Sequence, residues 1–435
     1  MKPCEVTLSQ MLEARERRAA LQQDTLAEYG GSLLCFTMNL AGPVKRSPLA
    51  DFAFLAGERM IAARGWEPRQ HIRLCRPTGC EAVYALDIPG PELKEAAISM
   101  EDALPVGRLF DMDVIGPDGI KLSRKEQRPC LVCGGPAALC ARSRTHGLSA
   151  VQAAAEALLA DFAADTLAAA AHWSLLDEAC LTPKPGLVDG TNAGAHQDMD
   201  LAAFEKSAAA LLPYFREAVR FGLENATYAP AMASLRQAGL EAEQTMLAAT
   251  GGVNTHKGLI YSLGLLLCGL GQSLAGQGEN YILHAKRLAG VGLEEALQNA
   301  KRAPQSHGER IYSQTGLLGA RGEAAVGFPT AVKTHEALRA ARKSLPENEA
   351  RILALLSSMA ELADTNLLHR GGEAGLKFVQ GEARRILALE PDAQRLLCAV
   401  RELDAACISR GLSPGGSADM LALALFLDRV EGWMP

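Results

Sequence analysis

The sequence predicts a multidomain protein, with an N-terminal α/β domain over residues 1–160 and a larger all-α domain over residues 161–435. Strand-like and helix-like segments are mixed in the first part, whereas long Ala- and Leu-rich segments follow from Ser149, with hardly any alternating stretch among them. A length of 435 residues allows two or three domains. Apolar residues make up 48% of the chain and aromatic residues only 5%, so we expect cores built from Ala and Leu.

The first domain is expected to begin with a charged amphipathic helix at residues 9–28 and an apolar strand at 32–40 that ends at Ala41-Gly42-Pro43. The next expected elements are a helix, two strands and a short helix, at residues 51–64, 71–75, 82–88 and 91–100. A further strand at 108–115 is turned by Gly116-Pro117-Asp118-Gly119 into residues 120–123, which predicts a β-hairpin.

The second part is expected to consist of helices at residues 149–179, 201–223, 229–249, 256–275, 290–301, 330–343, 347–363, 373–389, 391–410 and 417–430. Residues 149–179 are compatible with one long helix or with two. We therefore place the domain boundary near residue 160.

Composition excludes several classes of protein. A net charge of −6 argues against a general nucleic-acid binder. The N-terminus lacks the apolar core of a signal peptide, and the most apolar window, Gly258 to Leu274, is interrupted by glycines and shorter than the ~20 residues of a membrane span. Eleven cysteines, without a secretion signal, predict free thiols in a reducing, cytoplasmic compartment.

Two carboxylates define the first candidate site. In GRLFDMDVIGPDG, Asp111 and Asp113 are two residues apart on a predicted strand and therefore share a face, while Phe110, Met112 and Val114 face the core. Paired carboxylates repel each other unless a cation lies between them, and Mg²⁺ is the natural candidate. The alternative is an exposed strand face near a turn. Arg108, just upstream, is a candidate phosphate contact.

A basic, cysteine-containing tract follows this strand. Its charges would suit a polyphosphate or an acidic protein partner, or would simply be solvated; they are Lys121, Arg124, Lys125, Arg128, Arg142 and Arg144. The tract also carries four residues that suit tetrahedral zinc, although a reduced structural cluster is equally compatible with the spacing: Cys130, Cys133, Cys140 and His146. In either case we expect the cluster to be structural and not catalytic.

The first domain resembles a known family. GPVK at residues 42–45, GRLFDMDVIGPDG, LSR at 122–124 and RPCLVCGGPAALCARSRTH at 128–146 are together similar to the citrate lyase holo-acyl-carrier synthases, which are apo-citrate lyase phosphoribosyl-dephospho-CoA transferases. The resemblance implies a nucleotidyltransferase-like fold in which Asp111 and Asp113 are Mg²⁺ ligands. It also implies substrate or phosphate contacts from Lys45, Arg108, Arg142 and Arg144.

The second domain is organised around Leu181 to Met199, a Pro- and Gly-rich stretch between helices that reads LTPKPGLVDGTNAGAHQDM. Polar side chains on a loop of fixed shape usually meet a ligand. Four later segments have the same character: 250–258 (TGGVNTHKG), 319–323 (GARGE), 364–372 (DTNLLHRGG) and 413–420 (SPGGSADM). We therefore expect one site built from five helix-connecting loops.

These segments carry carboxylates, imidazoles and cations, a combination that suits a phosphate-bearing substrate with Mg²⁺, and also glycosyl chemistry. Individually, Asp419 is equally explained as a helix-capping residue, and His256 as a satisfied loop histidine. Neither a G-x-x-x-x-G-K-[ST] nor a G-x-S-x-G motif is present in the sequence.

The five segments resemble, in order, the triphosphoribosyl-dephospho-CoA synthases, whose substrates are ATP and 3′-dephospho-CoA. The resemblance implies phosphate binding by Lys184, Lys257 and Arg321. Mg²⁺ binding or oxocarbenium stabilisation is assigned, without division of roles, to Asp189, Asp198, Glu243, Asp364 and Asp419. Further substrate contacts are expected from His196, Asn254, His256, Glu323, Asn366 and Arg370.

Together, the two resemblances imply a bifunctional transferase that makes the citrate lyase prosthetic group and attaches it to a serine of the acyl-carrier (γ) subunit, with no nucleic-acid or membrane partner. Three alternatives remain open at this point. They are the equivalent pathway for malonate decarboxylase, a metal-dependent hydrolase of nucleotides or ADP-ribosyl groups, and a non-enzymatic module built on the zinc-binding tract.

Overall fold

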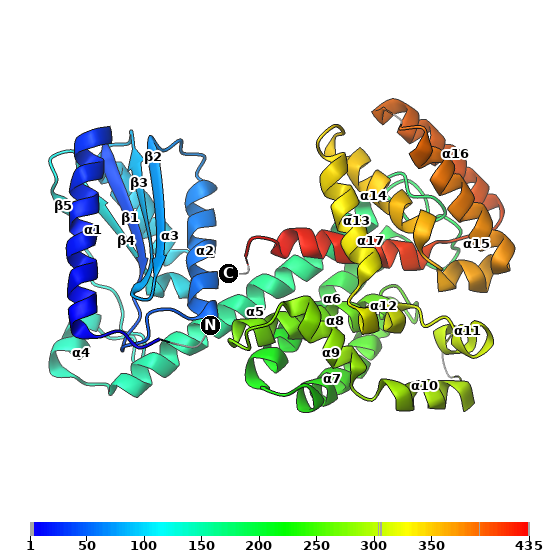
Figure 1. The fold of residues 1–435 in the computed structure, drawn as a ribbon, viewed down its shortest axis with the longest axis horizontal. Coiled ribbons are helices and arrows are strands. Elements are labelled where there is room, and N and C mark those ends of the chain that lie inside the picture. The colour runs from blue at the N-terminus through cyan, green and yellow to red at the C-terminus, as the bar shows by residue number, and fades with distance from the viewer. Residues whose placement is uncertain (1–3, 303, 305–306, 391, 434–435) are drawn as a thin grey trace. The chain divides into compact units, whose positions relative to one another are not determined.

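The computed structural model describes residues 4–302, 304, 307–390 and 392–433. The chain divides into two compact units: one contains the residues up to Ala163 together with those from Gly432 onward, and the other is Ala164–Glu431 (Figure 1). Within the described residues, all strands belong to the first unit, as the sequence predicts.

The first unit is built on a five-stranded sheet of order β2-β3-β1-β4-β5. Its strands are β1 (Ser32–Met38), β2 (Gln70–Arg76), β3 (Gly79–Leu86), β4 (Phe110–Ile115) and β5 (Lys121–Leu122). The expected hairpin is confirmed, since Val114 pairs with Leu122. The described pairings are all antiparallel, so this unit is α+β in the strict sense and contains none of the parallel pairs of an α/β sheet.

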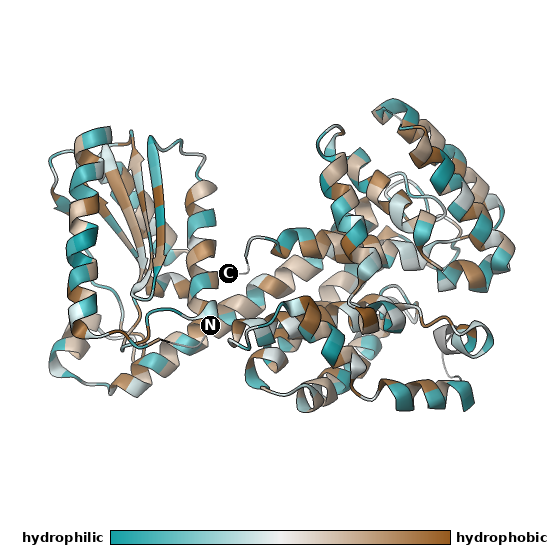
Figure 2. Ribbon diagram, in the orientation of Figure 1, coloured by the Kyte–Doolittle hydropathy of each residue, from teal (hydrophilic) through white to brown (hydrophobic). Residues whose placement is uncertain are grey.

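The sheet has an apolar core on each face. On one face, strand residues such as Phe36 and Met112 pack against α2 (Pro48–Ala62) and α3 (Gly90–Asp102). On the other face, Leu33, Cys35, Val83 and Ala85 form a smaller cluster with side chains of α1 (Leu8–Tyr29). Figure 2 shows the strands in mostly hydrophobic colours and α1 with extensive hydrophilic ones, which fits a helix that buries only one side.

The structure corrects the expectation that every cysteine is a free thiol. Cys75 and Cys80 form a disulfide. The cause is the register of the β2–β3 hairpin, in which these two residues are direct cross-strand neighbours. The remaining cysteines are free.

The regular elements among the described residues of the second unit are all helices. Helix α5 (Leu148–Cys180) begins in the first unit and continues into the second as one uninterrupted helix of 33 residues, so of the two interpretations of this segment the single helix holds. The elements that follow are α6 (Leu201–Glu224), α7 (Tyr228–Ala249), α8 (Lys257–Leu274), α9 (Tyr281–Gly290), α10 (Leu293–Arg302), α11 (His307–Thr315), α12 (Ala320–Val326), α13 (Pro329–Ala341), α14 (Glu347–Glu361), α15 (Thr365–Ala388), α16 (Ala393–Ser409) and α17 (Gly415–Val430).

Helix α8 is the most apolar helix of the chain and lies in the interior. Among the described residues it is the one helix long and apolar enough to cross a membrane, but 78% of it is buried inside the fold. It packs chiefly on α6 and α9. Burial on this scale is what a core helix of a helical domain requires.

Three of the five segments expected to be loops are helix N-termini. Residues 319–323, 364–372 and 413–420 form or contain the first turns of α12, α15 and α17. The prediction was wrong here because it interpreted glycines as signs of loops. Gly319 directly precedes the first turn of α12, and Gly372, with φ of 59°, interrupts α15 without ending it. Only 181–199 and most of 250–258 are loops.

Candidate functional site

The carboxylate pair of the first unit lies on strand β4. Burial alternates along this strand as predicted: Phe110, Met112 and Val114 are fully buried, whereas Asp111 and Asp113 are half-buried on the opposite face. Their partners across the sheet are Thr37 and Cys35. Since Cys35 belongs to the cluster beneath α1, the two carboxylates lie on the α1 side of the sheet.

The two carboxylates have different surroundings. Asp113 Oδ2 lies 2.5 Å from Lys121 Nζ and is therefore paired. Burial, and next the neighbouring charge of Asp113, raise the pKa of Asp111, while Lys121 and Arg128 act in the opposite direction. Asp111 is thus the member of the pair whose charge is less well compensated within the protein.

Two arginines, Arg108 and Arg128, hold the basic, cysteine-containing tract against the start of β4. Arg128 donates to the Phe110 carbonyl at 2.7 Å and forms an ion pair with the buried Glu101. Glu101 in turn accepts from the Met112 amide at 2.8 Å. Arg108 donates to the Pro129 carbonyl at 2.6 Å, so the side chain expected to contact phosphate is here engaged with the tract.

The other predicted contacts of this unit are spread more widely. Lys45 donates to the Leu40 carbonyl and lines a cavity of 260 Å³ with Arg15. Burial, followed by the charge of Arg15, lowers the Lys45 pKa. Arg142 and Arg144 are exposed, at the end of the short helix α4 (Ala137–Ser143).

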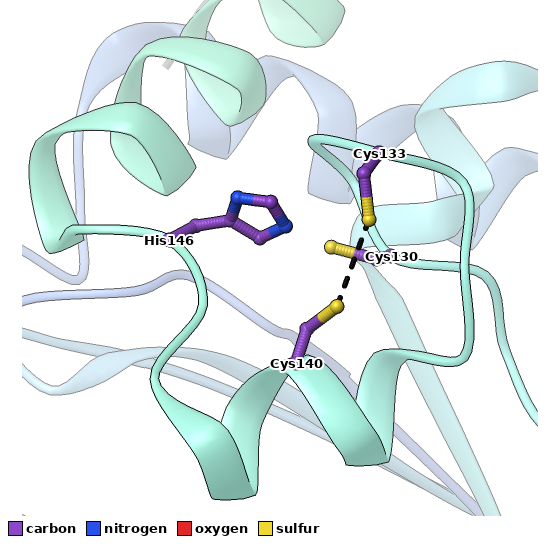
Figure 3. Close-up of side chains that lie close together, drawn as sticks. All are labelled: Cys130, Cys133, Cys140 and His146. Carbon is purple, nitrogen blue, oxygen red and sulfur yellow. Dashed lines mark hydrogen bonds between the residues drawn. The ribbon is translucent and has the colours of Figure 1, made fainter.

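The four predicted zinc ligands lie together in the structure (Figure 3). Ligand atoms of Cys130, Cys133, Cys140 and His146 are all within 4.8 Å of one another. The nearby backbone of Cys133, and next that of Val132, lowers the pKa of Cys130 to about 6. The geometry of this cluster is therefore compatible with a metal site.

In the second unit, two buried carboxylates shape the loop of residues 181–199. Asp189 accepts from the Thr191 and Asn192 amides at 2.7 and 2.9 Å, and its other oxygen accepts from the Lys184 amide. Asp404 of α16 accepts from the Gly186 amide at 2.8 Å and from Asn192 Nδ2 at 3.2 Å. Asp189 is therefore engaged in holding the loop rather than facing a ligand.

His196 connects this loop to two helix N-termini. Its Nε2 lies 2.8 Å from Ser413 Oγ, before α17, and its Nδ1 lies 3.0 Å from the Arg370 guanidinium on α15. Burial, and next the charge of Arg370, lower the pKa of His196. Because Arg370 can only donate, His196 Nδ1 accepts, and its protonated Nε2 donates to Ser413.

The N-termini of four helices meet beside this loop. Asp364, the N-cap of α15, accepts from the Ser417 amide of α17 at 2.8 Å. A Cβ on Gly258 of α8 would overlap the carboxylate of Asp419 on α17. A Cβ on Gly319 of α12 would touch Thr365 of α15. Four helix N-termini converging in this way create a region of positive potential suited to an anion.

The floor of this region, by which we mean the side chains beneath the helix N-termini, contains the carboxylates of Glu178, Asp364 and Asp419. Burial, followed by the charges of Glu178 and Asp364, raises the pKa of Asp419 well above its usual range. Lys184 is only 2% exposed, and its ammonium lies 2.7 Å from both the carboxylate and the carbonyl oxygen of Glu178. The predicted phosphate ligand Lys184 is therefore already in a buried ion pair.

His256, the residue before α8, lies near the ion pair of Lys184 and Glu178. Its Nδ1 lies 2.7 Å from Ser207 Oγ, while its Nε2 is buried and has no hydrogen-bond partner among the described residues. Burial, and to a lesser degree the charge of Lys184, lower its pKa to about 3. The imidazole is neutral at physiological pH, with one nitrogen left unsatisfied.

The remaining predicted residues lie around the same region or serve the helix ends. Lys257 Nζ is 2.7 Å from Glu243 and 49% exposed. Arg321 is half-buried near Tyr261 of α8, Asn254 accepts from the Lys257 amide, and Asn366 is exposed at the start of α15. Glu323 accepts from Thr330 at the start of α13, and Asp198 is exposed 3.9 Å from His196.

Sequence reasoning missed the residues that stabilise the site from the helices. Glu178, Ser207 and Asp404 lie within Ala- and Leu-rich segments for which the sequence predicts helices but no site residues. A usable signal was present, since an acidic residue on an otherwise apolar helix face is rarely buried without a partner.

Comparisons with known proteins assign both units. Residues 6–162 match the family model described as apo-citrate lyase phosphoribosyl-dephospho-CoA transferase. Residues 164–435 match the model described as ATP:dephospho-CoA triphosphoribosyl transferase.

Related proteins have the same combination. Protein CitXG of Haemophilus influenzae is 37% identical over 452 residues, covering 98% of this chain and 97% of that protein. Protein CitXG of Leuconostoc mesenteroides is 31% identical, covering 98% of each. The 2-(5''-triphosphoribosyl)-3'-dephosphocoenzyme-A synthase of Haemophilus ducreyi is 40% identical over 68% of this chain and 98% of that protein. The chain therefore belongs to the family of fused transferases in which an apo-citrate lyase phosphoribosyl-dephospho-CoA transferase is followed by a triphosphoribosyl-dephospho-CoA synthase.

Proposed function

We propose that the two activities of this family are divided between the two parts of the chain, with transfer in residues 1–160 and synthesis in residues 161–435. The helical part converts ATP and 3′-dephospho-CoA into 2′-(5″-triphosphoribosyl)-3′-dephospho-CoA and adenine. The N-terminal part then transfers phosphoribosyl-dephospho-CoA to a serine of the citrate lyase acyl-carrier (γ) subunit and releases pyrophosphate. The cytoplasm, where ATP and dephospho-CoA are available, is the proposed location.

The observation that carries the synthase assignment is the convergence of the N-termini of α8, α12, α15 and α17 over buried carboxylates. The partial positive charge of helix N-termini favours a triphosphate, and Lys257 and Arg321 lie at two of these four ends. Lys184 lies beneath this region in a buried ion pair with Glu178, so its charge is offset within the protein. Phosphate and cation are thus accommodated in the same region.

Asp419 is the carboxylate that best fits Mg²⁺, because the oxygens of Asp364, like those of Asp189, are engaged by hydrogen bonds. Asp364 already accepts four hydrogen bonds, whereas no hydrogen bond or ion pair is formed to Asp419 within the part of the chain that the structure describes. A hard divalent ion takes such oxygen ligands and would offset the charge of the triphosphate. The sequence groups Asp189, Asp198 and Glu243 with these carboxylates. Asp189 and Asp198 act by positioning the loop of residues 181–199, and Glu243 acts by positioning Lys257.

In the synthase reaction, the 2′-hydroxyl oxygen of dephospho-CoA forms a bond to C1′ of the ATP ribose, and the bond from C1′ to adenine breaks. The carboxylates stabilise the positive charge that develops at C1′. The proton of the 2′-hydroxyl is lost as the bond to C1′ forms. Adenine leaves with a proton, so that the overall reaction is balanced.

In the transfer reaction, the serine oxygen of the carrier attacks the phosphate that is linked to the ribose, and pyrophosphate leaves. Two carboxylates on one strand face, with basic residues at both ends of the strand, support a nucleotidyltransferase-like site in the first unit. Asp111 and Asp113 would hold Mg²⁺, whose charge would offset that of the leaving pyrophosphate. Lys45, Arg108, Arg142 and Arg144 are the proposed contacts for substrate phosphates or for an acidic carrier.

The test uses purified full-length protein with ATP, dephospho-CoA and Mg²⁺. We expect adenine and a nucleotide with the mass of the triphosphoribosyl product, and both should require dephospho-CoA. Adding the apo acyl-carrier subunit of citrate lyase should then yield a modified carrier and pyrophosphate. Release of adenine or ADP-ribosyl groups without dephospho-CoA would identify a hydrolase instead. Preferential modification of the malonate decarboxylase carrier would identify the parallel pathway.

A further inference from the structure

The cluster of Cys130, Cys133, Cys140 and His146 has the dimensions of an occupied metal site. Figure 3 shows the three sulfur atoms directed toward one another, with the imidazole facing them. The Cys133 and Cys140 sulfurs are 3.6 Å apart. Two thiolates bound at about 2.3 Å to one tetrahedral zinc ion are separated by roughly 3.8 Å, whereas a disulfide requires about 2.05 Å. The observed spacing matches shared coordination.

The backbone around Cys130 forms a tight turn. The Cys130 amide donates to the Gly135 carbonyl at 2.6 Å, and the Gly134 amide donates to the Cys130 carbonyl at 3.0 Å. This turn, in which Gly134 adopts a positive φ, places Cys130 and Cys133 next to each other in the cluster. The backbone therefore holds two of the four candidate ligands in position.

His146 provides an independent indication of a ligand. Its Nε2 is buried and has no hydrogen-bond partner among the described residues. A buried ring nitrogen without a partner is unfavourable, by roughly 1–3 kcal/mol for a neutral polar group, unless an unseen ligand satisfies it. His146 is also one of the four residues whose ligand atoms lie within 4.8 Å of one another.

We propose that Cys130, Cys133, Cys140 and His146 bind one structural zinc ion that fixes the basic tract against the start of β4. Three cysteines and one histidine complete a tetrahedron and leave no position for substrate, so the ion has no step in either reaction. Arg128 and Pro129, immediately before the first ligand, make the contacts to Phe110 and Arg108 described above. Zinc binding would therefore support the strand that carries Asp111 and Asp113.

The test measures zinc directly in the full-length protein. Protein purified without chelator should contain about one zinc per chain, and cobalt substitution should give the visible absorption bands of tetrahedral thiolate coordination. Cys133→Ser and His146→Ala should each lose most of the metal, whereas His146→Cys, which restores a fourth ligand, should retain it. Cys398→Ser, an exposed cysteine in the second unit, is the matched control and should keep full zinc content.

The effect on function is the second measurement, and only this part rests on the proposed division of activities. Loss of zinc in Cys133→Ser should lower the melting temperature of the first unit and reduce carrier modification at least about tenfold, while adenine release stays within about twofold of wild type. Wild-type protein without zinc and with a disulfide between Cys133 and Cys140 would overturn the metal site. Zinc binding with unchanged transfer in the metal-free variants would overturn only the supporting role.

Discussion

Asp111 and Asp113 face the same side of β4 but differ in their partners, because Lys121 reaches only Asp113. Asp111, whose negative charge is less well compensated by the protein, is expected to depend most on an added cation. A site of this kind is not needed for folding, since the opposite face of the strand supplies the buried side chains. The two carboxylates can therefore be tested separately from stability.

Asp111→Asn and Asp113→Asn are each expected to reduce carrier modification by at least about hundredfold, because each removes a negative oxygen ligand worth several kcal/mol of transition-state stabilisation. Adenine release should be unchanged. Asp24→Asn, at an exposed position on α1, is the matched control and should leave both activities intact. The two products are measured in one reaction, and loss of adenine release in a folded variant would contradict separate sites.

Lys257→Ala is expected to raise the Michaelis constant for ATP by roughly ten- to hundredfold, since a charge-assisted contact to phosphate contributes about 1.5–3 kcal/mol. Stability should change by less than about 1 kcal/mol, because the pair of Lys257 with Glu243 is partly exposed. Lys377→Ala removes a comparable exposed ion pair on α15 and should change neither quantity. Unaltered ATP kinetics in Lys257→Ala would rule out the phosphate contact.

At the level of single residues, the sequence indicated which side chains gather in the candidate site. It did not indicate which of them are already paired with other groups of the protein. His196, Arg370 and Ser413 were all on predicted segments, and the structure joins them. Lys184 was assigned to phosphate, yet Glu178 holds it. The sequence could not reveal this pairing, because it depends on how the loop after α5 folds back over the end of that helix.

Among the helices, the close approach of the N-termini of α8 and α17 depends on Gly258. Gly258→Ala would drive a methyl group into the carboxylate of Asp419. We expect a loss of stability of about 1–3 kcal/mol and a larger loss of synthase activity than of transfer. Gly239→Ala on α7, where an added Cβ meets atoms no closer than 3.7 Å, is the control and should be neutral or slightly stabilising. Chemical denaturation and adenine release measure the two effects.

Helix α8 also carries a pH-dependent element, the buried His256 that precedes its first residue. Its pKa is lowered to about 3 in the folded state, so between that value and the ordinary pKa near 6.5 the unfolded chain binds a proton that the folded chain does not. The stabilising contribution is complete above pH 6.5 and is lost as the pH falls below that value.

Replacement of His256 should therefore change the slope of stability against pH. Between pH 4.5 and 6, His256→Gln should lose stability less steeply than wild type, by roughly 1.4 kcal/mol per pH unit. His172→Gln, on α5, is the control histidine. Denaturant titrations at several pH values measure the slopes, and parallel curves for wild type and His256→Gln would contradict a neutral, buried imidazole.

The helices and strands themselves were largely predictable, and the errors have physical causes. Alternation identified β4, and long apolar periodicity identified α6, α7 and α14. No comparable pattern marks α4, α9, α11 and α12, which are ten residues or shorter and present few apolar turns. The glycine-rich starts of α12, α15 and α17 were wrongly predicted as loops. Glycine is common in turns, but it also occurs where two helix ends approach closely, and the sequence does not distinguish these cases.

For the molecule as a whole, the central prediction concerns the intermediate. A variant without transfer, Asp111→Asn, and a variant without synthesis, Asp419→Asn, are each expected to leave the carrier unmodified. A mixture of the two should restore modification, since a soluble nucleotide released by one chain can bind to another. Equimolar wild type at half the total concentration is the control for rate. No restoration, with each remaining activity intact, would show that the intermediate stays within one chain.

The hydrogen bonds from Gly186 and Asn192 to Asp404 span 218 and 212 residues of sequence. Chains emerge from the ribosome N-terminus first, and domains fold as they become complete. The sheet that carries Asp111 and Asp113 is complete by Leu122, whereas the Gly186 amide and the Asn192 side chain lack their Asp404 partner until α16 has been translated. During synthesis the strand of Asp111 and Asp113 is therefore in place long before the loop of residues 181–199, and a ribosome that stops before residue 404 leaves a chain in which that loop lacks its contacts to α16.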